Sequence, residues 1–216
     1  MNSINTPQPR HLSQLLLILT LLISSIAVAP AGSPKAISIA NPGFEAQVLA
    51  SGAAEQPIEA WETERPYEGN PAVVVDLGEG KGFVGPTNAH EKANVVLIPG
   101  TQLVRQVLSE TWKPNTTYNL SAYVALAFSP GSSAVIGLAH GKAPLTTAGS
   151  LEIERVVASE TLPPEGQWQK LEVTITTGKS DPFLGQPIVV FAANSIFDGA
   201  NNLLVDGFQL TSVPSR

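Results

Sequence analysis

The stretch T-Y-N-L-S-A-Y-V-A-L-A-F, residues 117–128, alternates core-forming and solvent-facing positions with a period of two. Its even-numbered positions include Tyr118 and Leu120, and its odd-numbered positions include Asn119 and Tyr123. Successive side chains of a β-strand point to opposite faces of the sheet, so this pattern predicts a half-buried strand. The even-numbered set is expected to face a second sheet, which leaves Tyr123 on the outer face.

Similar short stretches occur outward from this strand along most of the chain. Turn signals such as Pro99-Gly100 and Lys113-Pro114-Asn115 separate them, and no stretch after residue 31 has a sustained helical period. Short strands with regular turn signals are typical of an all-β sandwich or barrel. We therefore predict an all-β, two-sheet antiparallel jelly-roll sandwich, with strands over residues 72–77, 93–98, 102–108, 117–128, 134–140, 151–162, 167–177, 187–194 and 203–213.

The expected strand at 187–194 differs from the others because Ile188–Ala193 is apolar in both phases of the alternation. A half-buried strand would place polar side chains on its solvent face. This strand is therefore predicted to be central in its sheet or covered on both sides.

The first 31 residues have the composition of a secretory signal peptide. Arg10 and His11 precede an almost wholly apolar run over residues 15–28, and Ala29-Pro30-Ala31 supplies the small residues of a cleavage site. We predict a signal peptide at 1–31, one domain at 32–216 and secretion; an uncleaved signal anchor is the alternative. The chain has no cysteine, which excludes a lipoprotein anchor and disulfides.

The charge pattern argues against several partners. The net charge is −6, and the 12 Lys and Arg residues form no cluster. Nucleic acids and anionic membranes are bound through basic patches, so neither is an expected partner. No second apolar segment follows the first, and no stable membrane anchor is expected once the signal peptide is removed.

Five short motifs, taken in order, resemble a known family. The motifs are N-P-G-F-E at 41–45, L-V-R-Q-V-L at 103–108, P-N-T-T-Y-N-L-S at 114–121, G-Q-W at 166–168 and V-D-G-F-Q-L at 205–210. Their order and spacing resemble the galactose-binding-like jelly rolls, in particular carbohydrate-binding modules of the family 4/9 type. The similarity covers residues 37–213.

The resemblance implies that the first and last strands lie side by side and that a structural calcium ion lies near them. The matching positions for its side-chain ligands are Glu45 and Asp206, completed by backbone carbonyls. Calcium prefers several oxygen ligands, including carboxylates, and an ion joining both chain ends would close a long loop. The alternative is that both carboxylates serve turns and caps without an ion.

A carbohydrate would be expected to stack on exposed aromatic side chains. The candidates are Tyr123 on the outer strand face, Trp112 beside a turn, and Tyr67 in a Gly/Pro-rich loop. Trp61 and Trp168 are interpreted as packing residues. One departure weakens the sugar interpretation, because the strand at 187–194 offers no hydroxyl partner before Asn194.

Catalytic motifs are hard to find in the sequence. Glu152 and Glu154 share a strand face as a glycosidase pair would, but Val156 and Val157 occupy the region of a third acidic residue, so we interpret the two as a solvated edge pair. There is no G-x-S-x-G elbow, and the three His are isolated. The sequence therefore predicts a non-catalytic, secreted carbohydrate-binding module. The alternatives are an envelope or extracellular jelly roll that binds protein partners and, ranked last, a polysaccharide lyase or hydrolase.

Overall fold

The computed structural model describes residues 32–64, 72–77, 86, 88–100, 102–127, 132–141, 155–195 and 202–215. The predicted signal peptide, Tyr67, Glu152 and Glu154 lie outside these residues, and the expectations about them stay predictions. The strands are β1 (Lys35–Ile37), β2 (Ala54–Glu55), β3 (Glu62–Glu64), β4 (Val73–Asp76), β5 (Asn94–Pro99), β6 (Leu103–Thr111), β7 (Thr116–Leu126), β8 (Ala134–His140), β9 (Arg155–Thr161), β10 (Gln169–Thr176), β11 (Pro187–Asn194) and β12 (Asn202–Pro214). The described part contains no helix long and apolar enough to cross a membrane.

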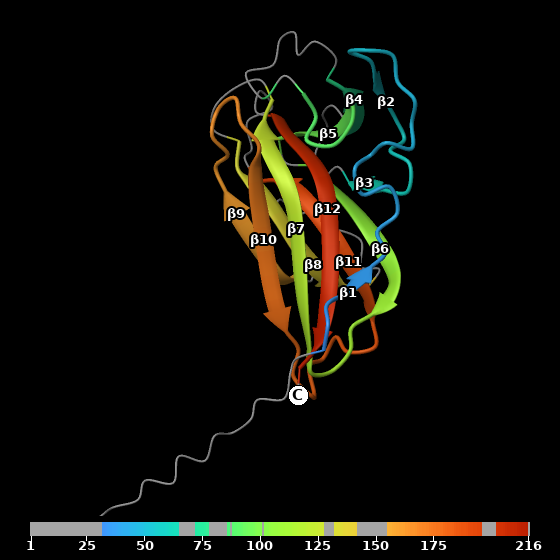
Figure 1. Cartoon of the computed structure of the whole chain (residues 1–216), viewed down its shortest axis with the longest axis vertical. Helices are drawn as coiled ribbons and strands as arrows, with labels where there is room; N and C mark the ends of the chain where they lie inside the picture. Colours follow the sequence, from blue (N-terminus) through green and yellow to red (C-terminus); the bar gives the residue numbers. More distant parts are fainter. Residues whose placement is uncertain are drawn as a thin grey trace, which may run out of the picture. The chain divides into compact units, whose positions relative to one another are not determined.

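The strands form two antiparallel sheets, which confirms the predicted β-sandwich. Sheet A has the order β10-β7-β12-β5-β4-β2, with β1 also paired to β12, and sheet B has the order β3-β6-β11-β8-β9. In Figure 1 the strands β10, β7 and β12 lie in front of β8 and β11. Each expected strand appears within a few residues of its predicted bounds, whereas the short edge strands β2 and β3 were not predicted.

The main core lies between the two sheets and follows the period of two. On β7, Tyr118, Leu120 and Val124 are buried in it, as the alternation predicts. Strand β11 is central in sheet B and apolar on both faces. Its residues Ile188 and Val190 belong to the main core, while Val189 and Phe191 belong to a second cluster on the outer face. The prediction for this strand is confirmed.

The two ends of the domain are joined, also as predicted. Strand β1 pairs antiparallel with β12, with Ile37 opposite Leu210. The rings of Phe44, Trp61 and Phe208 form one cluster with centroid distances of 5.2, 6.2 and 4.8 Å. Buried aromatic pairs at such distances stabilise a core beyond their area of burial. The N-terminal segment is thus fixed to the last strand by backbone pairing and aromatic packing.

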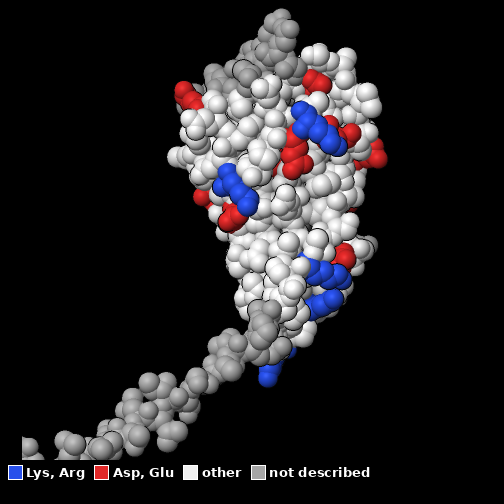
Figure 2. Space-filling model, in the orientation of Figure 1, with Lys and Arg blue, Asp and Glu red and all other residues white. Residues whose placement is uncertain are grey.

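Charged side chains are sparse on the face that sheet A presents. Figure 2 shows isolated basic and acidic groups separated by wide uncharged areas, with no continuous basic patch on this face.

Candidate active site

The centre of the candidate site is Asp206, on the outer face of sheet A. Asp206 lies directly opposite Tyr123 on β7, and Tyr123 lies opposite Lys170 on β10. Directly opposed residues of antiparallel strands point to the same side of the sheet. Two residues predicted for different roles, Tyr123 for ligand and Asp206 for metal, are therefore neighbours.

A β-bulge on β12 places the Asp206 carboxyl on this face. The register with β7 shifts between Asp206 and Gln209, and Gly207 has a φ of +62°. The bulge turns Phe208 into the main core while both Asp206 and Gln209 stay on the outer side. A Cβ on Gly207 would lie 3.2 Å from an oxygen of Glu91 and 3.4 Å from the Tyr123 ring, so this position favours glycine for two reasons.

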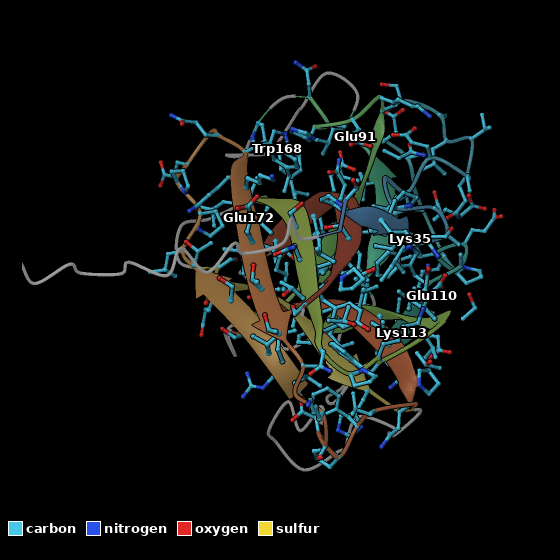
Figure 3. All side chains as sticks on the ribbon, turned by 60° about the horizontal axis from the view of Figure 1, so that its bottom comes forward. Lys35, Glu91, Glu110, Lys113, Trp168 and Glu172 are labelled. Atoms are coloured by element: carbon cyan, nitrogen blue, oxygen red, sulfur yellow. The ribbon has the colours of Figure 1, made fainter. Side chains whose placement is uncertain are left out.

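Residues 88–94, which we call the covering segment, lie over Asp206 and Tyr123. The His90 ring stacks on the Tyr123 ring with a centroid distance of 3.3 Å and an interplanar angle of 16°. The backbone N–H of Glu91 donates to Asp206 Oδ2 at 2.7 Å, and Trp168 Nε1 donates to the Asn88 carbonyl at 2.9 Å. Figure 3 shows Trp168 and Glu91 at one end of the molecule, away from Lys113. One face of Tyr123 is therefore already occupied.

The covering segment is also tied to the N-terminal part of the domain. Glu45 Oε1 accepts hydrogen bonds from the N–H groups of Ala93 and Asn94, at 3.0 and 2.9 Å. The Asn94 side chain donates to the carbonyls of Phe44 and Gln47, at 3.2 and 2.7 Å. Glu45, near the start of the domain, and Asp206, near its end, thus both accept hydrogen bonds from the covering segment.

Burial changes the acid strength of Asp206. The side chain is fully buried, and this burial raises its pKa to about 7. The N–H groups of Glu91 and Gly207 favour the charged form and lower the pKa, while the charges of Glu91 and Glu45 raise it. A carboxyl with a pKa near 7 can both give and take a proton at neutral pH.

Apolar side chains continue the outer face beyond Asp206. Leu204 on β12 and Ala125 on β7 are the next pair on the same face, two residues further along the ladder. They belong to an outer apolar cluster formed by Val75, Leu77, Val95, Leu97, Ala125, Ala127 and Leu204. Trp168 packs against this cluster and lies edge-on to His90, with ring centroids 6.2 Å apart. Asp206 therefore lies where an apolar and aromatic surface ends.

The fit of this site to calcium is incomplete. Carboxylate oxygens are ligands that calcium prefers, and Glu45, Glu91 and Asp206 supply them. The two glutamates also lie near enough to Asp206 for their charges to raise its pKa. However, no three His, Cys, Asp or Glu side chains of the described residues come close enough to hold an ion. Both predicted ligands also accept backbone N–H groups. We derive no step of a reaction through a metal here.

The remaining predicted ligand residue, Trp112, lies elsewhere. Its side chain is buried, and its Nε1 donates to the Ala139 carbonyl at 3.2 Å. It packs edge-on against Tyr118 and Phe183, so the exposure expected beside a turn was wrong. His90 and Glu91 were missed, because they lie between strands, where no periodic pattern marks them.

Fold and site together define a β-sandwich in which a carboxyl with a raised pKa is buried under an aromatic cover, and carboxyls with shifted pKa values are common at functional sites. The model of the HpiC1-like family, described as HpiC1 cyclase, matches residues 35–197. The chain belongs to this family of cyclases. No curated protein sequence is similar enough to this chain to add a relative.

Solved cyclase structures have the same fold. A Stig cyclase, Fisc, from Fischerella sp. TAU, in complex with (3Z)-3-(1-methyl-2-pyrrolidinylidene)-3H-indole, superimposes with a TM-score of 0.68 at 20% identity, over 85% of this chain and 100% of that chain. An apo-form cyclase from Fischerella sp. gives 0.66 at 21% identity, over 85% and 98%. A cyclase from Fischerella sp. TAU in complex with 4-(1H-Indol-3-yl)butan-2-one gives 0.68 at 20% identity, over 84% and 99%.

The family membership corrects two predictions. A non-catalytic carbohydrate-binding module was expected, and the cyclase family overturns both the absence of catalysis and the sugar ligand. The reason is physical as well: Tyr123, the expected sugar platform, is covered by His90.

Proposed function

We propose that this chain is a cyclase that closes a ring in a small, unsaturated molecule, with Asp206 as the proton donor. The observation that carries the proposal is a buried carboxyl of raised pKa, located between an apolar cluster and aromatic rings, in a member of a cyclase family. Protonation of a carbon–carbon double bond needs an acid that is neutral at working pH and shielded from water.

The proposed reaction is an isomerisation. Asp206 gives its proton to one carbon of a double bond, the adjacent carbon becomes cationic, and a second double bond attacks it to close the ring. A carbon of the new ring then returns a proton to the Asp206 carboxylate, which gives a neutral cyclic product and regenerates the acid. The ring of Trp168, which packs against the outer apolar cluster next to Asp206, favours the cationic stage, because aromatic faces attract positive charge.

The ligands of the Fischerella cyclases guide the choice of substrate. Both complexes contain an indole ring, so indoles with an unsaturated side chain are the first compounds to test. Purified protein in D₂O is expected to convert an active compound to a cyclic isomer that carries one deuterium.

The matched variant for this experiment is Asp206→Asn, which keeps the shape of the side chain but cannot donate the same proton. We expect its turnover to fall by about 10²- to 10⁴-fold, the usual contribution of a general acid. Glu165→Gln, an exposed acid in the turn before β10 and outside the groove described below, is the control and should retain activity. Unchanged turnover in Asp206→Asn would assign the acid to another residue.

A calcium ion held through Glu45 and Asp206 is a second proposal for the same carboxylates. The charges of Glu45 and Glu91 raise the pKa of Asp206. The residues next to these glutamates in the sequence, Phe44 and Lys92, have positive φ angles of +59° and +48° although neither is glycine. Such backbone strain persists only where the surroundings fix it, as at ligand sites. The ion would join the two ends of the domain and would keep Asp206 ionised.

Calcium binding and proton donation therefore exclude each other at Asp206. If calcium binds, CaCl₂ should raise the melting temperature of the wild type, corresponding to about 2.7 kcal/mol at a hundredfold excess over Kd. Glu45→Gln and Asp206→Asn should each remove this shift. A calcium effect that survives both substitutions would remove these two residues as ligands.

A further inference from the structure

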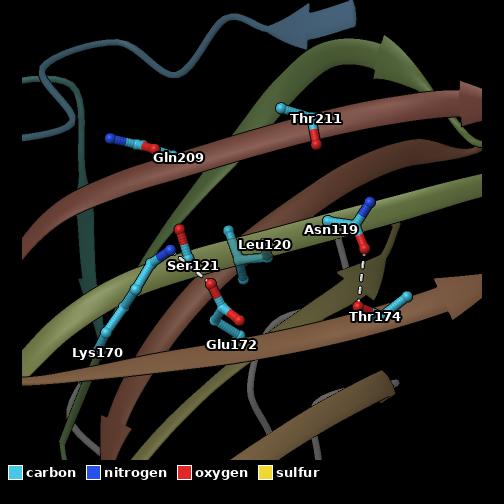
Figure 4. A pocket seen from close by; sticks show the side chains of 8 residues that line it. All are labelled: Asn119, Leu120, Ser121, Lys170, Glu172, Thr174, Gln209 and Thr211. Carbon is cyan, nitrogen blue, oxygen red and sulfur yellow. Dashed lines mark hydrogen bonds and ion pairs between the residues drawn. The ribbon is translucent and has the colours of Figure 1, made fainter. Parts of the chain in front are cut away.

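A polar groove runs along β7 on the outer face of sheet A, next to Asp206. Its volume is about 280 Å³, and side chains of β7, β10 and β12 line it. Figure 4 shows its floor on β7, with Lys170 and Glu172 on one side and Gln209 and Thr211 on the other. Nothing in the function proposed above uses this groove.

The strand register joins the groove to the candidate active site. Glu172, Ser121 and Gln209 form one cross-strand row, directly beside the row of Lys170, Tyr123 and Asp206. Rows that share a face are two residues apart along a strand, which is about 7 Å. The groove therefore adjoins the Asp206 row, which the covering segment overlies.

The outer face of sheet A consequently changes from apolar to polar along its strands. The apolar cluster of Leu204 and Ala125 lies on one side of the Asp206 row, and the groove lies on the other. The Asp206 row thus separates buried apolar side chains from the hydrogen-bonding side chains of the groove.

The groove has unused hydrogen-bonding groups but no net charge. Within the described residues, the side chains of Ser121, Gln209 and Thr211 make no hydrogen bond to protein. Lys170 Nζ pairs with Glu172 Oε1 at 2.5 Å, so the two charges of the lining compensate each other. Thr174 donates to Asn119 at 2.8 Å, which fixes the far end.

We propose that this groove binds an uncharged, hydrogen-bonding portion of the substrate, such as a carbonyl or hydroxyl, while the reacting portion lies at Asp206. The inference rests on the proposed function and adds the substrate class, a molecule with one apolar, unsaturated part and one neutral polar part. The groove volume is just below the usual range for whole-ligand pockets, about 300–1,000 Å³, which fits a part of a substrate. Gln209 and Ser121 are the residues that determine this specificity.

The test uses three probes with the same phenyl-alkyl body: 4-phenylbutan-2-one, 4-phenylbutanoate and 4-phenylbutylamine. Binding to the full chain is followed by NMR shifts of the Ser121 and Gln209 amides. We expect the neutral ketone to bind about threefold or more tighter than either ion, because a compensated ion pair offers little to a free charge. Gln209→Ala should weaken the ketone about twofold to tenfold, the range for one neutral hydrogen bond.

Gln167→Ala is the matched control, because it removes an exposed amide outside the groove. The inference is overturned if an ion binds more tightly than the ketone, if no probe binds, or if Gln209→Ala and Gln167→Ala behave alike. Failure of the proposed function has a different result: Asp206→Asn would keep its turnover, whatever the groove binds.

Discussion

At the scale of single residues, the proposed proton transfer depends on what neutralises the charge of the Asp206 carboxyl. A carboxylate buried beside Glu45 and Glu91 is costly, and the cost is relieved by a proton or by a cation. The raised pKa describes the first case, in which Asp206 is about half protonated at pH 7 and largely neutral below about pH 6. In the proposed function, the same residue links both catalysis and stability to pH.

The sign of the pH dependence follows from this shift. The pKa of Asp206 is about 7 in the folded protein and 3.8 in a free side chain, so the folded state binds the extra proton between these values. Stability should fall as pH rises from about 4 to 7, by about 4 kcal/mol at most. Urea unfolding of the wild type and of Asp206→Asn at several pH values measures this loss, because the variant lacks the titrating carboxyl. Equal pH slopes for the two proteins would contradict the raised pKa.

Gly207 is the second residue on which the site depends. Gly207→Ala would place a methyl group 3.2 Å from the Glu91 carboxylate in a backbone conformation with positive φ. We expect a loss of about 1–3 kcal/mol in the free energy of unfolding. Gly52→Ala is the control, because its φ is also positive but no atom lies within 4 Å of the added carbon. A larger loss in Gly52→Ala would show that contacts with Glu91 and Tyr123 are unimportant.

At the scale of strands, periodicity predicted the elements well and their connections poorly. The alternation in β7 and the apolar run of β11 correctly indicated which faces are buried, because burial acts on every second residue. The bulge at Gly207 and the covering segment could not be predicted this way. They depend on contacts between residues far apart in sequence, such as Glu91 with Asp206, which no local pattern records.

Sheet B contains a close contact that tests the packing of its central strands. A Cβ on Gly137 of β8 would lie 2.4 Å from the Phe191 ring of β11 and 2.7 Å from the Val157 carbonyl. Gly137→Ala should therefore lower the free energy of unfolding by about 1–3 kcal/mol through overpacking. Adding Phe191→Leu should recover part of the loss, since the two residues are in contact. Strictly additive effects in chemical denaturation would argue against this contact.

At the scale of the whole domain, the N-terminal segment and the last strand act together. The sequence predicted that they would be neighbours, and the ring cluster of Phe44, Trp61 and Phe208 confirms it. It did not predict catalysis, because the family resemblance pointed to sugar binding, and one fold carries many functions. Asp206 could be recognised as a candidate acid only from the folded structure, which brings it together with Glu91 and Tyr123.

The joining of the two ends has a direct consequence for stability. Phe44→Ala would leave a cavity against Trp61 and Phe208, and we expect a loss of about 3–5 kcal/mol. Val48→Ala, at a side chain that is 99% exposed, should change stability little. Thermal unfolding of both variants checks this; similar melting temperatures would mean that the N-terminal segment contributes little to the fold.

The central claim is that Asp206 holds a transferable proton near neutral pH. Carbon-13 labelling of the aspartate carboxyls, with Asp206→Asn to assign the signal, allows its titration to be followed by NMR in calcium-free buffer. We predict a midpoint at about pH 7. A midpoint near 4, the ordinary value for an aspartate, would contradict the assignment of Asp206 as the acid of this cyclase.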